Sequence, residues 1–221
     1  MRIKYFVISG EIVKFVRYSI DNMDRSNSYK LTVLIPTLKS RTPKLGLLLD
    51  ELDHQIQGRA VQWLTIGDNK SMTVGEKRNF LKSMAKGEFV CFVDDDDVIE
   101  HNYIDTILAA IGSHPDKKVI HFKGRQTTDG RTDAPFKYGR RYGRNFKKTE
   151  DGTRWKVMLP DHLCVWRRDM MELEDFPHKQ LGEDHDWARA MTLHYEDSDE
   201  LFIDEYLYFY HFSRQETECR R

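Results

Sequence analysis

The sequence predicts an α/β domain in which helices flank a mostly parallel sheet. Strand-like apolar runs alternate with helix-like patterns through the first half of the 221-residue chain, as expected of parallel strands joined by right-handed crossovers. One of these runs, residues 89–93, ends in four consecutive carboxylates, Asp94 to Asp97. Because ligands of open α/β sheets bind outside the carboxyl ends of the strands, we expect the functional site at this end.

The chain starts with a segment that we separate from the main domain. Residues 3–8 and 12–18 read as two strands able to form a hairpin about Gly10, and a polar linker follows over residues 21–30. We therefore assign residues 1–28 to an N-terminal strand extension and linker. The remainder, residues 29–221, is assigned to a single domain, because a chain of this length can bury one good core.

Four strands and three helices are expected in the alternating half. The strands cover residues 31–37, 61–66, 89–93 and 119–122. Thr42 is the expected N-cap of the first helix, with Pro43 at its first position and leucines at helical spacing behind it. A capping box, Thr73 to Glu76, opens the second helix, which carries Phe80, Leu81 and Met84. The third helix is expected over residues 101–111.

The four carboxylates after the third strand predict a metal site. Like charges at this density repel unless a cation or hydrogen-bond donors lie among them. Alternate members of the run, Asp94 and Asp96, can converge on one hard cation, and oxygen ligands suit Mg²⁺ or Mn²⁺. A solvated acidic turn is the alternative.

Other strand ends contribute to the same crevice. Pro36 and Thr37 end the first strand, and Asp68 follows the second. Neither a Gly-x-Gly-x-x-Gly fingerprint nor a Gly-x-x-x-x-Gly-Lys-Ser/Thr loop occurs in the chain, which argues against dinucleotide-binding and P-loop proteins. Any phosphate in this crevice is therefore expected to be held through a metal on the acids.

Taken together, these segments resemble the motifs of family 2 glycosyltransferases, which have the GT-A fold, a Rossmann-like nucleotide-diphospho-sugar transferase fold. The similarity is carried in order and spacing by Leu31-Thr-Val-Leu-Ile-Pro-Thr37, Gly67-Asp-Asn69, Gly75-Glu-Lys-Arg-Asn79, Ala85-Lys-Gly-Glu-Phe-Val-Cys-Phe-Val-Asp-Asp-Asp-Asp97 and Gly182-Glu-Asp-His-Asp186. It covers roughly residues 30–210. The resemblance implies metal-dependent transfer of a sugar from a nucleotide-diphosphate donor, usually a UDP-sugar, with inversion at the anomeric carbon.

The resemblance also implies roles for individual residues. Asp68 matches the acid that contacts the base, Arg78 a nucleotide-site arginine, and Asp94 and Asp96 the D-x-D metal acids, while Pro36, Thr37 and Asp95 fall at the donor site. Asp184 matches the catalytic base, with Glu183 as the neighbour able to replace it. Residues 29–122 would form the nucleotide-sugar-binding half and residues 123–221 a smaller, mixed acceptor-binding half.

This sequence departs from the pattern at two positions, and each assigned role has a structural alternative. Gly67 replaces the first acid of the usual Asp-Asp pair, and Lys70 is inserted before Ser71. Asp68 can be a turn residue, and Arg78 can lie on a solvated helix face. Acids in a first helical turn, such as Asp184, favour the helix dipole without any catalytic role.

The chemistry explains why such residues are needed. A divalent cation offsets the negative charge that builds up on the departing nucleoside diphosphate. The acceptor hydroxyl needs a general base on the opposite face of the sugar.

The second half contains the expected acceptor region. Residues 136–148 hold six basic residues interleaved with aromatics and no acid, a composition that can stack sugars or bases and pair phosphates. A surface loop or β-hairpin is the alternative, and we expect this stretch to be mobile without ligands. The candidate acceptor residues are Arg140, Arg141, Tyr142, His162 and Trp166. Near the end of a late strand over residues 205–212, His211 is a candidate third metal ligand or a core histidine.

Composition limits the remaining classes. The formal net charge is −1, so no global field marks nucleic acid or an anionic membrane as partner. The three cysteines, Cys91, Cys164 and Cys219, are odd in number and far apart, which predicts reduced thiols. No signal peptide or membrane span is recognisable, so a cytoplasmic protein is expected.

Two other functions compete with the transferase. The Asp94-x-Asp96 pattern after a strand also resembles the nucleophile motif of haloacid-dehalogenase phosphatases, although two strand–helix units precede it here. A non-catalytic nucleic-acid-binding protein that uses residues 136–148 is the other. The acceptor of a transferase stays open between polysaccharide or other glycan, lipid, protein and modified DNA such as hydroxymethylated DNA. The sequence does not indicate an oligomeric state.

Overall fold

The structure is a computed structural model that describes residues 2–8, 12–18, 28–143 and 146–213. The first part of the chain forms, in order, β1 (Arg2–Ile8), β2 (Ile12–Tyr18), β3 (Tyr29–Leu38), the 3₁₀ turn η1 (Lys39–Arg41), α1 (Thr42–Gln55), β4 (Val61–Asp68), α2 (Val74–Met84), β5 (Gly87–Phe92), β6 (Val98–Ile99) and α3 (Tyr103–Ser113). The alternation of strands and helices that the sequence predicts is therefore confirmed.

The second part is richer in strands. It forms β7 (Val119–Thr128), β8 (Arg131–Thr132), β9 (Phe136–Tyr138), η2 (Arg140–Tyr142), β10 (Phe146–Glu150), β11 (Thr153–Met158), β12 (Val165–Arg167), α4 (Arg168–Met171), α5 (Glu183–Met191), η3 (Asp197–Asp199) and β13 (Glu200–Phe212). The basic stretch thus contains β9, η2 and β10, and β10 pairs with β11 in an antiparallel hairpin. Only its last residues, 146–148, belong to this hairpin, whereas β9 pairs with β7 and β11.

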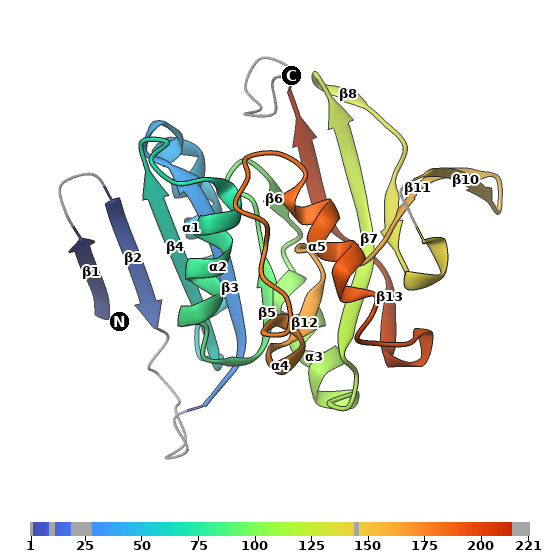
Figure 1. The fold of residues 1–221 in the computed structure, drawn as a ribbon, viewed down its shortest axis with the longest axis horizontal. Helices are drawn as coiled ribbons and strands as arrows, with labels where there is room; N and C mark the ends of the chain where they lie inside the picture. The colour runs from blue at the N-terminus through green and yellow to red at the C-terminus, as the bar shows by residue number, and fades with distance from the viewer. Residues whose placement is uncertain (1, 9–11, 19–27, 144–145, 214–221) are drawn as a thin grey trace.

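All these strands belong to one mixed sheet. Its order is β1-β2-β4-β3-β5-β12-β7-β9-β11-β10, with β13 paired to β6 and β7, and β8 paired to β7. Neighbours β4, β3 and β5 are parallel, as predicted. The short β12 lies between β5 and β7 and is antiparallel to both. β5 and β7 therefore run in the same direction but are not paired with each other. Figure 1 shows β1 and β2 at one end of the sheet and the β10–β11 hairpin at the other.

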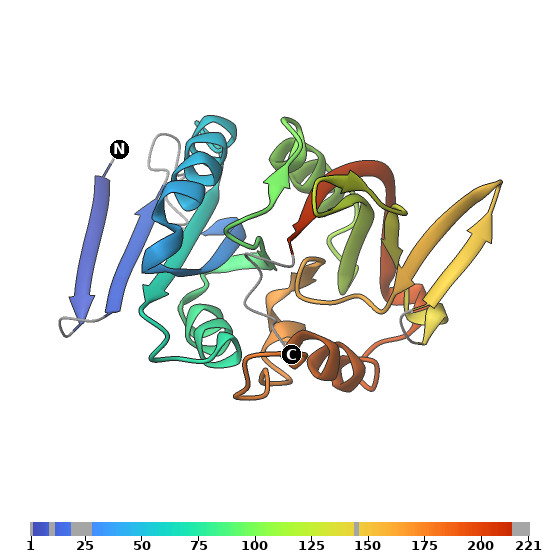
Figure 2. The ribbon, with the colours of Figure 1, turned by 90° about the horizontal axis from the view of Figure 1, so that it is seen from above.

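Helices cover both faces of the sheet. Figure 2 shows α1 and α3 on one face and α2 with α5 on the other, in agreement with the contacts between the members of each pair. The central strands are buried on both sides, which explains their continuous apolar runs: Leu31, Val33, Leu34 and Ile35 of β3 are all 0% exposed. This packing confirms the predicted α/β class.

One predicted detail of the helix ends is wrong. Thr42 is the first residue of α1, not its N-cap, because Arg41 at the end of η1 takes the cap position and the Thr42 hydroxyl donates to the Lys39 carbonyl. Met84, the last residue of α2, is 45% exposed. The Thr73–Glu76 capping box at the start of α2 is present as predicted.

The N-terminal strands pair as a hairpin would. β1 and β2 are antiparallel, and β2 is also antiparallel to β4, so this extension continues the main sheet. Gly10 and residues 21–27 of the expected linker lie outside the described residues. The division of the chain at residue 28 stays a prediction.

The structure describes two of the three cysteines that are predicted to be free thiols. Cys91 and Cys164 are buried and free, and burial raises the pKa of Cys91 to about 12. Cys219 lies outside the described residues. Within the described part of the chain, none of the helices has both the length and the apolar character needed to cross a bilayer.

Candidate active site

A cavity of about 310 Å³ opens at the carboxyl ends of β3 and β5. It lies between the predicted nucleotide-binding and acceptor-binding halves, and both contribute to its wall. The residues that line it include Pro36, Thr37, Arg41, Lys77, Arg78, Asp94, Asp95, Asp96, Gln126, Phe136, Tyr138, Met158, Asp161, His162, Glu183, Asp184, Tyr210 and His211. The sheet topology thus brings together strand ends that are far apart in sequence, as the carboxyl-end rule predicts.

The four acids after β5 alternate in direction. Asp95 and Asp97 are 3% and 4% exposed, whereas the Asp94 and Asp96 side chains are 27% and 17% exposed and line the cavity. Asp97 is used by the fold: it accepts hydrogen bonds from the Tyr208 hydroxyl at 2.8 Å and the His211 backbone N–H at 2.9 Å. Asp94 and Asp96, the alternate pair that the sequence singled out, are therefore the more exposed acids, while Asp95 also lines the cavity but is nearly buried.

The nearly buried Asp95 is held by side chains of β3 and η1. Its carboxylate accepts from the Thr37 hydroxyl at 2.5 Å and from Arg41 Nη1 at 2.8 Å. Arg41 Nη1 also lies 3.2 Å from Asp96 Oδ2. Burial, together with the charges of Asp94 and Asp95, nevertheless raises the pKa of Asp96 to about 6. The cluster thus holds more negative charge than its protein partners neutralise.

A buried arginine connects the acids to α5. Arg78 is 4% exposed and lies over the rings of Phe92 and Phe176, at 5.7 and 5.6 Å from their centroids, and these two rings contact each other edge-on. Its Nη2 is 3.3 Å from Asp94 Oδ1, and its Nη1 forms an ion pair with Glu183. Arg78 is thus neither a solvated helix residue nor an open nucleotide ligand in this structure, because both ends of its guanidinium are occupied.

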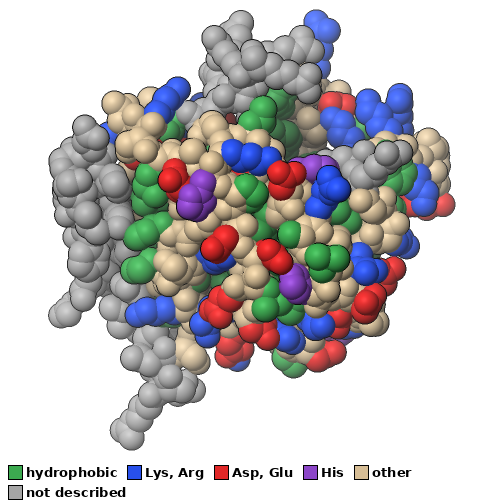
Figure 3. All heavy atoms as spheres, viewed as in Figure 1, with side chains coloured by type: hydrophobic (Ala, Val, Ile, Leu, Met, Phe, Trp, Pro, Cys, Tyr) green, Lys and Arg blue, Asp and Glu red, His purple; other side chains and the backbone are tan. Residues whose placement is uncertain are grey.

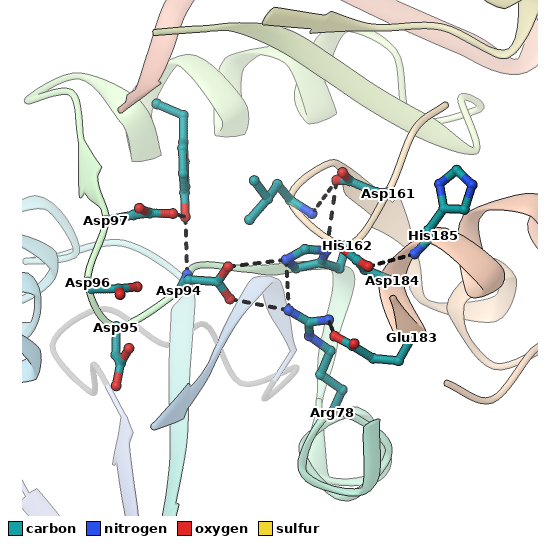
Figure 4. A network of polar contacts seen from close by, with 12 residues as sticks. Arg78, Asp94, Asp95, Asp96, Asp97, Asp161, His162, Glu183, Asp184 and His185 are labelled. Carbon is teal, nitrogen blue, oxygen red and sulfur yellow. Dashed lines mark hydrogen bonds and ion pairs between the residues drawn. The ribbon is translucent and has the colours of Figure 1, made fainter. Parts of the chain in front are cut away.

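His162 occupies the centre of the same network (Figure 4). Its Nε2 lies 2.9 Å from Arg78 Nη2 and 3.4 Å from Asp94 Oδ2, and its Nδ1 lies 3.8 Å from Asp184 Oδ2 and 4.0 Å from Asp161 Oδ1. Burial alone would raise the pKa of Asp94, but His162 and Arg78 outweigh it and hold that pKa below its usual range. One imidazole therefore separates the candidate metal acid from the candidate base.

The start of α5 distinguishes the three candidate bases. Glu183 is 5% exposed and is committed to Arg78. Asp186 is exposed, pairs with Lys179 at 2.5 Å and does not line the cavity. Asp184 has a side chain that is 37% exposed, lines the cavity, and accepts the His185 backbone N–H through Oδ1. Of the three carboxylates, that of Asp184 is the one open to an acceptor hydroxyl.

Asp68 does not line the cavity. Its side chain is fully buried, accepts the Met72 backbone N–H at 2.6 Å and the Ser71 hydroxyl at 3.0 Å, and pairs with Lys77 Nζ at 2.5 Å. Lys77 Nζ also donates to the Thr37 carbonyl at 2.9 Å. In this structure Asp68 therefore closes the turn after β4 and is not exposed to a base.

The predicted acceptor residues are mostly outside the cavity. Trp166 is 0% exposed, because β12 is a central strand, and its indole packs edge-on against Trp187. Arg140 points to Glu196 and Asp197, each at 3.3 Å. Arg141 donates to the hydroxyl of Tyr142, which packs with Trp155 and Val157. His162 is the predicted acceptor residue that lines the cavity.

Several cavity residues were not predicted from the sequence. Lys77 precedes Arg78 within a recognised motif, and Asp161 precedes His162. In both pairs the sequence predicts the second residue as a site residue and not the first. Asp161 is held by the Leu163 backbone N–H at 2.9 Å, and burial raises its pKa to about 6. Gln126, Met158 and Tyr210 carry no chemical signal in the sequence, because only the pairing of β7, β11 and β13 brings them to the site.

This arrangement of strands and helices is similar to that of solved structures. S. aureus TarS residues 1–349 match with a TM-score of 0.59 and 18% identity over 82% of this chain and 60% of that chain. The fold is a GT-A fold. The same TarS fragment in complex with UDP gives 0.59 at 18% identity over 83% and 61%, and in complex with UDP-GlcNAc 0.57 at 18% identity over 86% and 60%.

The likeness establishes the GT-A fold alone at this level of identity. This chain spans about 60% of the length of the TarS fragment. No protein-family model and no curated protein matches its sequence.

Proposed function

We propose that the protein is an inverting glycosyltransferase that moves a sugar from a UDP-sugar to a hydroxyl acceptor, with a divalent cation and with Asp184 as general base. The observation that carries the proposal is the convergence of Asp94, Asp96 and Asp184 on one cavity at the strand ends of a GT-A fold. The similar TarS structures contain UDP and UDP-GlcNAc, which supports a nucleotide-sugar donor.

The residues present suit a hard divalent cation, Mn²⁺ or Mg²⁺. Asp94 and Asp96 offer carboxylate oxygens at the cavity surface, His211 lines the same cavity, and the raised pKa of Asp96 indicates charge that a cation would offset. Among the described residues no three His, Cys, Asp or Glu side chains are pre-arranged as a ligand set. Donor phosphates commonly complete such a shell. When bound, the cation would supply Lewis-acid stabilisation of the leaving diphosphate.

The base assignment follows from access and surroundings. Asp184 Oδ1 is held by a backbone N–H, which leaves Oδ2 directed toward His162 and the cavity. A carboxylate in this position can accept the proton that an acceptor hydroxyl loses as its oxygen attacks the anomeric carbon. The competing candidate Glu183 would first have to leave Arg78, a buried partner whose loss is costly.

Pro36, Thr37 and Asp95 are proposed to lie at the donor end. They come from β3 and the loop after β5, and Thr37 and Asp95 are hydrogen-bonded to each other at 2.5 Å. Arg78 is proposed to contribute indirectly, by holding the Asp94 carboxylate in position. Asp68 keeps its assigned contact with the base only if the turn after β4 rearranges when the donor binds.

The proposal is tested by incubating the protein with individual UDP-sugars, with Mn²⁺ or with EDTA, and measuring released UDP and thermal stability. A glycosyltransferase should hydrolyse its donor slowly without acceptor and be stabilised by donor plus metal. Release of phosphate from monoesters, with Asp94 phosphorylated, would instead support the phosphatase alternative. If neither donor hydrolysis nor donor-dependent stabilisation occurs with any UDP-sugar, the transferase proposal fails.

A further inference from the structure

The β10–β11 hairpin is a cationic edge on a protein of almost no net charge. Residues 136–158 contain eight Lys or Arg and two acids, so the rest of the chain must be acidic overall. β10 is the last strand of the sheet, and Figure 3 shows Lys and Arg side chains along the edge where Figure 1 places the hairpin. The positive charge is therefore local and faces solvent at one end of the molecule.

The hairpin register sorts its charges onto two faces. Lys148 is opposite Trp155, and Glu150 points the same way, where it pairs with Lys148 at 2.7 Å and with Lys137. Lys147 is opposite Lys156, and Arg154 follows on the same face two residues earlier in β11. One face is thus neutralised by an acid, and the other is lined by three cations.

The cationic face is only partly compensated within the described residues. Lys156 Nζ contacts Asp133 at 2.5 Å and Gln126 at 2.8 Å. Lys147 and Arg154 are exposed and have no ion pair with any described residue. Like charges directly opposite in a ladder destabilise it, and Lys147 and Lys156 are such a pair. An anionic ligand over this face would remove that repulsion.

The cationic face is continuous with the cavity wall. Met158 lines the cavity, and alternation along β11 places Lys156 and Arg154 on the same side as Met158, at steps of about 7 Å. Lys156 also reaches Gln126, a cavity residue of β7. A chain-like anion lying along β11 would therefore run into the cavity beside Met158.

An exposed aromatic ring lies on the other face of the same edge strand, because Phe146 is opposite Val157 and alternation places it with Lys148 and Trp155. Phe146 precedes Lys147, is 41% exposed, and contacts the Tyr142 ring edge-on at 6.1 Å between centroids. Because β10 is the free edge of the sheet, a ligand that crosses this edge can reach Lys147 on one face and Phe146 on the other. A stacking ring and a row of cations that one flexible chain can contact together are the combination with which proteins bind single-stranded nucleic acid.

We propose that the β10–β11 hairpin binds a single strand of nucleic acid as the acceptor, with phosphates over Lys147 and Arg154 and a base on Phe146. This inference rests on the proposed function for the chemistry of the cavity. A hydroxyl oxygen of the strand bonds to the anomeric carbon and gives its proton to Asp184. The bond from that carbon to the diphosphate oxygen breaks, and its electron pair leaves with the nucleoside diphosphate.

The test is fluorescence anisotropy of a labelled DNA single strand of about 20 nucleotides at about 50 and about 200 mM salt. The double variant Lys147→Gln/Arg154→Gln should bind about tenfold more weakly at the lower salt and lose about 1.4 from the logarithmic salt slope. Phe146→Leu should weaken binding about tenfold with an unchanged slope. The charge-matched control Lys30→Gln/Lys86→Gln, at the amino ends of β3 and β5, should bind as wild type does.

Specific results would overturn the inference. The inference fails if the wild-type protein does not bind the strand at about 100 μM protein, or if the hairpin and control variants lose equal affinity for it. It also fails if a duplex binds more tightly than the single strand, or if linear polyphosphate binds equally well and Phe146→Leu has no effect. Thermal shift with UDP-sugar on the same variants separates the two proposals. Strand binding without any donor response would refute the transferase and the acceptor role together, whereas a donor response without strand binding refutes the hairpin inference alone.

Discussion

Replacing Asp96 by Asn should stabilise the protein when no divalent cation is present. Burial and the charges of Asp94 and Asp95 raise the Asp96 pKa from 3.8 to about 6, so the folded state holds this proton more tightly than the unfolded chain does. For an acid whose folded pKa is raised, stability falls as pH rises from about 4 to about 6, and the cost is complete above that window. At about 1.4 kcal/mol per pKa unit the full cost is about 3 kcal/mol, and Asn removes it.

The assay is urea denaturation with EDTA at about pH 8 and about pH 4.5, followed by tryptophan fluorescence. The Asn variant should be more stable than wild type by up to about 3 kcal/mol at the higher pH and by much less at the lower. The exposed Asp116→Asn change should alter stability by less than about 0.5 kcal/mol at either pH. Saturating Mn²⁺ with UDP-sugar should reverse the order, because wild type gains binding energy that the variant loses.

A destabilised Asp96→Asn variant at the higher pH would refute this reasoning. Such a result would mean that Arg41, 3.2 Å away, compensates the Asp96 charge fully and that the acid cluster is a closed ion-pair network. The cluster would then provide no drive for a cation to bind.

Three further predictions test the other parts of the site. Asp184→Asn should lower kcat by about 10²–10⁴ with donor and acceptor saturating while donor affinity is kept, and a rate within a few-fold of wild type, compared beside Glu183→Gln, would exclude Asp184 as the base. Arg78→Met should cost about 3–5 kcal/mol in urea denaturation, because it leaves the buried Glu183 carboxylate and Asp94 without their partner; a loss below about 1 kcal/mol would show that the network is not a structural support. Trp166→Ala should cost about 3–5 kcal/mol of stability through a core cavity but leave the acceptor KM of the remaining folded enzyme unchanged, and a selective rise in that KM would restore Trp166 to the acceptor site.

The fold could be predicted largely because its first half follows local rules. Apolar runs of β3 and β5, the capping box of α2 and the proline at the start of α1 each act within a few residues, and all point to the same alternation. The direction of Asp94 and Asp96 is set by the turn that follows β5, in which the Asp97 N–H donates to the Asp94 carbonyl. Local information was sufficient wherever a residue's environment is set by its own element.

The site residues that could not be predicted depend on long-range pairing. Trp166 is a core residue only because β12, more than 70 residues after β5 in the chain, is inserted between β5 and β7. Arg140 turns away from the cavity because Glu196 and Asp197 lie near it in space. No periodicity near residues 140 or 166 contains this information, since it belongs to partners far along the chain.

Arg78 and Asp68, which the resemblance assigns to the donor site, are held by other charged side chains in this structure. Both residues belong to segments that match donor-site motifs, yet both are buried and paired, Arg78 with Glu183 and Asp94, and Asp68 with Lys77. A charged side chain buried beside the site acts by fixing its neighbours, because removing it would leave an uncompensated charge in a low-dielectric region. A cation and donor that enter the cavity must therefore compete with Arg41, Arg78 and His162 for the oxygens of Asp94 and Asp96. The network would shift from its resting arrangement only if the cation and donor together match the charges of the acids better than these three side chains do.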